Sequence, residues 1–437
     1  MTISVYPEYK ESGVPWLGHV PEHWEVKRLK YVATLITRKS CVDEQAVALE
    51  NIESWTARYL ATDSEFEGDG VSFESGDILF GKLRPYLAKA WLAEFNGTAV
   101  GDFHVLRLRN VFDGRFACYL LLSQGYISLI DGSTFGAKMP RVSWEFMGNT
   151  VIPLPPFEEQ RAIASFLDRK TAQIDELIAK KEALLKKLDE KRTAIITQAV
   201  TKGLDPSVPM KDSGVEWIGK IPEHWIVLKI THGFKTIGSG TTPKSDNSDF
   251  YDGNIPWVTT SELRETVIEN TTQNISIDAF QTHSALKIYP TGSIVIAMYG
   301  ATIGRLGILG VDATVNQACC VFAQPATFVS VFFYYWLIMR KPILLSQSTG
   351  GGQPNLSLED LKHIRIPTPP IEEQQAIAEH IEKKTAIIDR QRAQVTEAIQ
   401  RLKEYRRSLI TNAVTGNIQI TAYYNQGTNH ANSRRLE

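Results

Sequence analysis

The chain has 437 residues, with 47 Lys and Arg against 49 Asp and Glu, so its formal net charge is −2, and 43% of its residues are hydrophobic. These values exclude a disordered tail, a collagen-like fibre and a disulfide-stapled miniprotein, and they argue against a protein that coats nucleic acid or membrane with bulk positive charge. At about 150 residues per domain, the length predicts two or three domains.

Two segments of the chain occur twice. Residues 12–24 are SGVPWLGHVPEHW and residues 213–225 are SGVEWIGKIPEHW, an offset of 201. Residues 152–164, IPLPPFEEQRAIA, recur as residues 366–378, IPTPPIEEQQAIA, at an offset of 214. The block between these landmarks is therefore 13 residues longer in the second half. This pattern indicates a duplication in which only the intervening blocks have diverged.

The two variable blocks, about 25–151 and 226–365, contain short apolar runs separated by Gly and Pro. Such punctuation predicts many short strands with a few helices. Residues 116–123 and 332–339 are the helix-like stretches. The strand-like runs are 77–80, 105–108, 294–298 and 318–322.

A long helix is predicted after each Pro-Pro pair, because no Pro or Gly occurs from there to Thr201 in the first copy. Apolar residues alternate at spacings of four and three over about four heptads, which favours a coiled-coil seam, and Gly203 and Gly416 end the two helices. The expected seam residues are Ile174, Ile178, Leu185, Leu188 and Ile195 in the first copy, and Ile388, Val395, Ile399, Leu402 and Leu409 in the second.

One such helix on its own is equally consistent with a surface helix packed on its own domain, with its lysine runs in solvent. Two matched seams in one chain favour pairing with each other in an antiparallel coiled coil. The span from Ile174 to Ala199 is about 38 Å at 1.5 Å per residue. That is close to one turn of B-DNA, about 34 Å.

No catalytic constellation is predicted. The segment 154–157, Leu-Pro-Pro-Phe, lacks the polar first residue of an amino-methyltransferase loop, and 238–243 lacks the GK[ST] ending of a P-loop. The Glu-Lys-Lys of 382–384 lies mid-helix without an Asp partner. His23 and His224 each belong to a repeated Pro-Glu-His-Trp segment, so we interpret them as structural residues.

The four cysteines form no CxxC pair, so we expect neither a zinc site nor a disulfide framework. Residues 1–11 contain no apolar signal region, and the most apolar stretch, 329–339, is far shorter than the roughly 20 residues of a spanning helix. We therefore expect a cytoplasmic location.

Basic, aromatic and amide side chains gather in loops of the variable blocks. Residues 82–115 contain six Lys or Arg and three acids. Arg and Lys engage phosphates or guanine edges, while Asn and Gln pair with adenine. Such residues are common on any surface, so this composition by itself does not decide for nucleic acid.

Together, the two Pro-Pro-x-Glu-Glu-Gln segments and the two Gly-x-x-Trp-x-Gly-x-x-Pro-Glu-His-Trp segments resemble the specificity subunits of type I restriction-modification enzymes. The resemblance covers essentially the whole chain, and residues 76–90 and 350–357 also look typical of that family's target-recognition domains.

The resemblance implies an α+β fold with two mixed α/β target-recognition domains joined by two long helices in an antiparallel coiled coil, with a pseudo-two-fold repeat. We expect recognition domain 1 with an N-terminal arm over 1–151, a central helix over 152–203, a linker and recognition domain 2 over 204–365, a second helix over 366–416, and a tail over 417–437.

The resemblance further implies a non-catalytic subunit that recognises a bipartite, asymmetric DNA sequence and sets the spacer length with its helices. Its partners would be double-stranded DNA, two methyltransferase subunits and the restriction-translocase subunits, and S-adenosylmethionine, ATP and Mg²⁺ would be used by those partners. The candidate DNA-binding residues are Lys82, Arg84, Tyr86, Lys89, Lys138, Arg141, Thr241, Thr242, Lys244, Tyr299, Arg305, Gln353 and Asn355.

Two other classes remain as alternatives. A fused methyltransferase or nuclease would need a methyl-donor loop or a carboxylate cluster, and neither motif is found in the sequence. A coiled-coil scaffold whose globular blocks bind proteins would show no selective binding to one bipartite DNA sequence.

Overall fold

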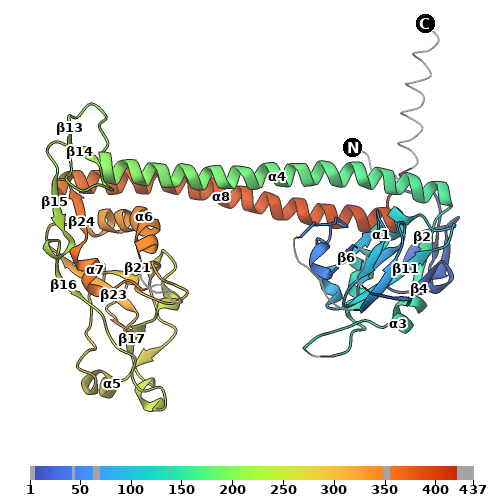
Figure 1. The fold of residues 1–437 in the computed structure, drawn as a ribbon, viewed down its shortest axis with the longest axis horizontal. Coiled ribbons are helices and arrows are strands. Elements are labelled where there is room, and N and C mark those ends of the chain that lie inside the picture. Colours follow the sequence, from blue (N-terminus) through green and yellow to red (C-terminus); the bar gives the residue numbers. More distant parts are fainter. Residues whose placement is uncertain (1–4, 42–44, 63–68, 137, 348–354, 421–437) are drawn as a thin grey trace, which may run out of the picture. The chain divides into compact units, whose positions relative to one another are not determined.

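The computed structural model describes residues 5–41, 45–62, 69–136, 138–347 and 355–420. They divide into two compact units, unit 1 with residues 1–183 and 396–437, and unit 2 with residues 184–395. Two long helices, α4 (Phe157–Lys202) and α8 (Ile371–Val414), cross this division, so each unit holds one globular domain and one segment of each helix (Figure 1). In the part of the chain described, no helix is long and apolar enough to cross a membrane.

The globular domain of unit 1 is built on two four-stranded sheets with the orders β5-β7-β10-β6 and β4-β11-β8-β9. A core of Val47, Phe73, Leu79, Trp91 and Val105 lies between them. The elements are β1 (Tyr9–Glu11), β2 (His19–Pro21), β3 (Glu25–Arg28), β4 (Ala33–Ile36), β5 (Lys39–Cys41), β6 (Ala46–Val47), β7 (Asp69–Phe73), β8 (Ile78–Gly81), β9 (Ala90–Leu92), β10 (Gly97–Ala99), β11 (Phe103–Leu108), α1 (Gly114–Leu121), α2 (Gln124–Asp131), α3 (Trp144–Asn149) and β12 (Val151–Leu154).

Unit 2 repeats this plan with a larger sheet, β16-β23-β20-β21-β18, and a smaller one, β19-β17-β22. Strand β18 adds a fifth, parallel edge strand to the sheet. The elements are β13 (Met210–Asp212), β14 (Lys220–Pro222), β15 (Ile226–Lys229), β16 (Phe234–Gly238), β17 (Ile255–Val258), β18 (Val267–Ile268), β19 (Asn274–Ile275), α5 (Ile277–Thr282), β20 (Ile294–Ala297), β21 (Leu306–Leu309), β22 (Thr314–Val315), β23 (Cys319–Pro325), α6 (Ser330–Gln347), α7 (Leu358–His363) and β24 (Arg365–Thr368).

The strand-like and helix-like runs of the sequence are confirmed, since they fall in β8, β11, β20, β23, α1 and α6. The helices expected to begin at 152 and 366 begin later, at Phe157 and Ile371. Residues 151–154 form β12, which pairs with β3, and residues 365–368 form β24, which pairs with β15. Each helix starts only after the Pro-Pro pair, because a residue that precedes a proline is disfavoured in the helical conformation. Both helices end at a left-handed glycine, Gly203 at φ 75° and Gly416 at φ 80°.

A fully buried glutamine joins the start of each long helix to its globular domain. The Oε1 atom of Gln160 accepts a hydrogen bond from the Asp113 backbone N–H at 2.8 Å, and its Nε2 donates to the carbonyls of Val111 and Pro155. Asp113 in turn caps α1 by accepting from two backbone N–H groups.

Gln374 makes the same three bonds in unit 2. It accepts from the Val329 N–H at 2.7 Å and donates to the carbonyls of Thr327 and Pro369. This shared geometry explains why the Glu-Glu-Gln segment occurs in both copies, since only an amide supplies both an acceptor and two donors here.

The glutamate that precedes each glutamine holds the repeated Pro-Glu-His-Trp segment. The Glu159 carboxylate lies 2.9 Å from Nε2 of His23 and accepts from the Tyr6 hydroxyl at 2.6 Å. The Glu373 carboxylate lies 2.7 Å from Nε2 of His224 and accepts from Nε1 of Trp225 at 3.1 Å. Both histidines thus have a structural partner at the start of a long helix.

The glycine at the end of each long helix packs on the Pro-Glu-His-Trp segment of the same unit. A Cβ at Gly416 would overlap Pro21 and approach Trp24 at 3.1 Å, and the Gly416 carbonyl accepts from the Tyr9 hydroxyl at 3.0 Å. Gly203 lies in the same way against the buried Trp225. In each unit a Pro-Glu-His-Trp segment therefore contacts the start of one helix and the end of the other.

The expected seam positions are the less exposed positions of the two helices. Ile174, Ile178, Leu188, Ile388, Ile399 and Leu409 are buried, and Leu185, Ile195, Val395 and Leu402 are half-buried. In unit 2 the segments run antiparallel, because Arg192 pairs with Asp389 and Arg392 pairs with Asp189 at 2.7 Å.

The matched glutamines give a stability prediction. Replacing Gln160 or Gln374 with Ala removes the partner of one backbone N–H and of two backbone carbonyls, of which the proline carbonyl belongs to a buried residue, so each variant should lose about 1–3 kcal/mol of unfolding free energy. The two losses should be similar, because the bonds are the same. Chemical denaturation measures both, with the exposed Gln173→Ala as a control that should change little. A loss no greater than in the control would contradict this role.

Candidate nucleic-acid interface

In unit 1 the structure brings two candidate segments together. The loop that connects β8 to β9 contains residues 82–89, which we name recognition loop 1. It lies beside residues 138–141, because Leu83 and Arg141 form a β-bridge and the Arg84 N–H donates to the Pro140 carbonyl at 2.8 Å. The basic residues of both segments thus share one region of the domain.

Asp102 holds two of these basic residues. Arg141 donates two parallel hydrogen bonds to its carboxylate, at 3.0 and 2.9 Å, and these bonds raise the pKa of Arg141 above its ordinary value. Lys82 lies 3.9 Å from the same carboxylate. Asp102 is one of the three acids of 82–115, and in the structure it fixes the position of Arg141.

Lys89 is also engaged within the domain. Its ammonium donates to the Leu49 carbonyl at 2.6 Å, and partial burial lowers its pKa while the nearby Glu50 opposes this shift. Two further basic residues of the 82–115 stretch are paired with acids, Arg107 with Asp77 and Arg115 with Asp168. The apparent excess of positive charge in the sequence is therefore largely neutralised at the surface.

Arg84 differs from these residues. Its side chain is exposed, and among the described residues no ion pair or side-chain hydrogen bond engages it. Its backbone is left-handed at φ 50°, as is that of Ala88 at φ 48°, and the two residues flank a short 3₁₀ turn, Pro85–Leu87. Glycine or asparagine would adopt this conformation more cheaply, and such strain is common at functional sites. Tyr86, 46% exposed, and Lys138 project from the same pair of segments.

The corresponding place in unit 2 has different chemistry. The β20–β21 connection begins at Met298 and carries Tyr299, which forms a β-bridge with Asn355, and the Leu356 N–H donates to the Met298 carbonyl at 2.7 Å. Asn355 corresponds to Arg141 at the offset of 214. An aromatic and an amide side chain thus occupy the bridge positions where unit 1 has a leucine and an arginine. Gln353 lies outside the described residues.

The remaining candidates of unit 2 lie in a second loop and at the end of the first. Nε1 of Trp257 donates to the Thr241 carbonyl at 3.2 Å, and the Thr242 hydroxyl donates to the Gln317 side chain. Lys244 and Arg305 are exposed. These contacts order the Thr241–Thr242 backbone and leave the two cations at the surface. Within the described ranges, no group of three or more His, Cys, Asp or Glu residues could hold a metal ion.

Comparison with known proteins decides which family has this architecture. The model of the type I restriction modification DNA specificity domain matches residues 21–187 and again residues 222–401. The chain belongs to this family. It is a DNA-specificity subunit of a type I restriction-modification system, a class of subunit that recognises DNA and does not itself catalyse.

Named relatives agree with this assignment. The chain is 27% identical over 364 residues to the EcoBI specificity subunit of Escherichia coli, covering 80% of this chain and 74% of that protein. It is 27% identical over 450 residues to the MjaVIII specificity subunit of Methanocaldococcus jannaschii, covering 94% and 97%.

Solved structures share the fold. A chain from a study of complex assembly and conformational transition in a type I R-M system superposes with a TM-score of 0.72 at 18% identity, covering 90% of this chain and 98% of that chain. The HsdS subunit from Thermoanaerobacter tengcongensis superposes with a TM-score of 0.51 at 20% identity, covering 91% and 98%.

The exposed Arg84 side chain gives a binding prediction. Arg84→Ala should weaken binding through the first recognition domain by about 1–3 kcal/mol, the usual value of a base-contacting arginine. Binding of the assembled complex to its target DNA measures the loss at fixed salt concentration. Arg115→Ala is the matched control, because Arg115 is paired with Asp168 on α1 and α4. Wild-type binding by Arg84→Ala would place Arg84 outside the interface.

Proposed function

We propose that the two recognition domains each recognise one half of a bipartite, asymmetric DNA sequence in the major groove. The observation that carries this proposal is the contrast at one equivalent position. The bridge between Leu83 and Arg141 in unit 1 corresponds to the bridge between Tyr299 and Asn355 in unit 2, so the backbone geometry is kept while the side chains differ. Arg favours guanine and Asn favours adenine, so two such domains would recognise unlike half-sites.

We further propose that α4 and α8 form an antiparallel coiled coil that sets the length of the unrecognised spacer. Burial at alternating spacings of three and four supports this pairing along both helices. The ion pairs Arg192–Asp389 and Arg392–Asp189 in unit 2 support the antiparallel direction. Continuous helices of 46 and 44 residues without Pro or Gly are stiff enough for such a spacer.

Membership of this family also suggests which partners and cofactors the chain works with. We propose two methyltransferase subunits and the restriction-translocase subunits as partners, in the cytoplasm, together with double-stranded DNA. S-adenosylmethionine, ATP and Mg²⁺ would be bound by those partners, and the role of this chain is to select where they act.

Domain exchange combined with methylation mapping tests the bipartite proposal. Residues 25–151 are replaced by the corresponding block of a relative, and methylated sites are mapped in cells that also express the methyltransferase subunits. One half of the methylated sequence should change while the other half and the spacer stay the same. A change in both halves, or methylation without a bipartite sequence, would refute the proposal.

The spacer proposal predicts the effect of helix length. Deleting one heptad from each helix keeps both seams in register and shortens the pair, so the complex should select a shorter spacer with the same half-sites. Methylation mapping reads out half-sites and spacer together. Exchanging exposed residues of the same heptads without changing their number is the control, and altered half-sites in the deletion variant would count against the proposal.

A further inference from the structure

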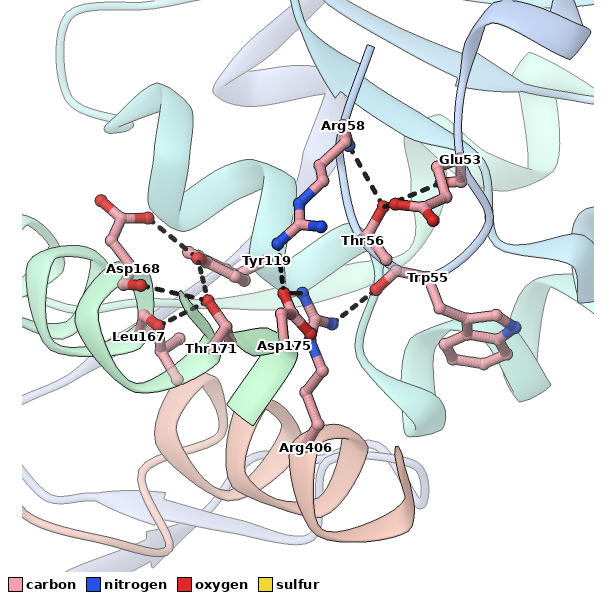
Figure 2. Close-up of polar contacts among 10 residues, drawn as sticks. All are labelled: Glu53, Trp55, Thr56, Arg58, Tyr119, Leu167, Asp168, Thr171, Asp175 and Arg406. Atoms are coloured by element: carbon pink, nitrogen blue, oxygen red, sulfur yellow. Dashed lines mark hydrogen bonds and ion pairs between the residues drawn. The ribbon is translucent and has the colours of Figure 1, made fainter. Parts of the chain in front are cut away.

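In unit 1 a second loop joins the helices to the globular domain. We name residues 53–58 the joint loop. Figure 2 shows Arg406 on α8 pointing both to Asp175 on α4 and to the joint loop. Nε of Arg406 donates to Asp175 at 3.0 Å, and its Nη1 donates to the backbone carbonyl of Trp55 at 2.7 Å. The Arg406 side chain is only 7% exposed, so this guanidinium is a buried charge in the helix seam.

Other contacts fasten the joint loop to both helices. Arg58 donates to the Asp175 carboxylate at 2.7 Å, and the guanidinium of Arg407 lies 4.3 Å from the centre of the Trp55 ring. The Thr56 hydroxyl donates to the Glu53 carboxylate at 2.7 Å, which closes the loop on itself (Figure 2). The loop is thus held to α4 by one charge pair, and to α8 by a hydrogen bond from Arg406 and by the contact of Arg407 with the Trp55 ring.

The joint loop also contacts recognition loop 1. The N–H of Trp55 donates to the carbonyl of Ala88 at 2.8 Å, and Ala88 ends the 3₁₀ turn that begins after Arg84. The backbone of Trp55 therefore connects the helix seam to recognition loop 1 through two hydrogen bonds. This path runs from the Arg406 guanidinium to the Trp55 carbonyl, and from the Trp55 N–H to Ala88.

Backbone strain is concentrated on this path. Trp55 and Ala57 are left-handed at φ 68° and 61°, and Arg84 and Ala88 are left-handed as well. They are the four such residues other than glycine in the described part of unit 1. Strain of this kind persists only where surrounding contacts over-determine the backbone. Here α8 contacts Trp55, Trp55 contacts Ala88, and Pro140 contacts Arg84.

Unit 2 offers a natural comparison. At the offset of 214, Asp389 corresponds to Asp175 and Arg192 corresponds to Arg406. This pair lies 3.4 Å apart and the Arg192 side chain is 29% exposed. In the described residues of unit 2, no loop carbonyl accepts a hydrogen bond from Arg192. The same seam pair therefore exists twice. In the described residues its arginine donates a hydrogen bond to a loop carbonyl in unit 1, whereas in unit 2 Arg192 lies near Tyr334 and Tyr335 of α6.

We propose that Arg406 and Trp55 are positioning residues, which couple the helix seam to recognition loop 1 and so fix the orientation of Arg84 toward its half-site. The coupling is confined to the first domain. This inference rests on the proposed function, since it needs two domains with separate half-sites. It goes beyond that function in assigning half-site discrimination to residues that face the helices.

The test uses the full chain assembled with its methyltransferase subunits. The domain exchange above first assigns one half-site to the first domain. Arg406→Gln is then compared with wild type on the target DNA and on two DNAs with a single base changed in either half-site. Discrimination at the first domain's half-site should fall about tenfold, which corresponds to about 1.4 kcal/mol, and discrimination at the other half-site should stay as in wild type.

Arg192→Gln is the matched control, because it alters the corresponding arginine without touching a recognition loop, and it should leave both half-sites discriminated as before. Arg58→Gln provides a second variant that leaves the seam pair intact, and it should show a smaller loss at the same half-site. Arg406→Lys should restore part of the discrimination, since lysine keeps the positive charge and N–H donors but places them on a single nitrogen. Melting temperatures of the variants separate positioning from stability.

Three results would overturn the inference. Equal losses at both half-sites would make Arg406 a general stability residue. Unchanged discrimination in both Arg406→Gln and Arg58→Gln would show that the joint loop does not position Arg84. A failure of the domain exchange to change one half-site would remove the proposed function itself, and it would be seen before any point variant is measured.

Discussion

The buried glutamine at the start of each long helix is the contact on which the rest of the structure depends. Gln160 and Gln374 are fully buried, and each accepts a hydrogen bond from one backbone N–H and donates to two backbone carbonyls. Because these bonds tie the helix to the loop before α1 or α6, the direction in which the helix leaves the domain is set at one residue. The adjacent glutamates add the repeated Pro-Glu-His-Trp segments to the same junction.

The Glu-Gln and Pro-Glu-His-Trp residues of this junction are the same in both units, whereas the residues of the recognition loops differ. The repeated segments serve the junction in both units, whereas the β8–β9 and β20–β21 loops keep their backbone bridges and change their side chains. The loop side chains therefore differ between the two units, while the contacts that attach each domain to the long helices stay the same. The near-neutral net charge fits such a subunit, since Asp102, Asp77 and Asp168 each engage an arginine of the first domain.

Much of this could be predicted from the residues alone. The repeat, the two long helices, their glycine ends and the alternating burial follow from local rules, because helix periodicity and the exclusion of proline act over a few residues. The structural role of His23 and His224 was also predictable, since both diverged copies retain it. Which cations of the candidate loops pair with an acid was not predictable. Asp102 is 39 residues from Arg141, and no local pattern indicates that the two meet.

The sequence by itself determined the duplicated plan, the family and the seam, because repetition and periodicity are written along the chain. Only the tertiary structure decided which groups Arg406 contacts. Its place in the heptad marks it as an unusual charge in a seam, while its partners, Asp175 and the Trp55 carbonyl, come from 231 and 351 residues away. The chain must fold before a buried guanidinium can find two acceptors, and such long-range pairing leaves no signature in local sequence.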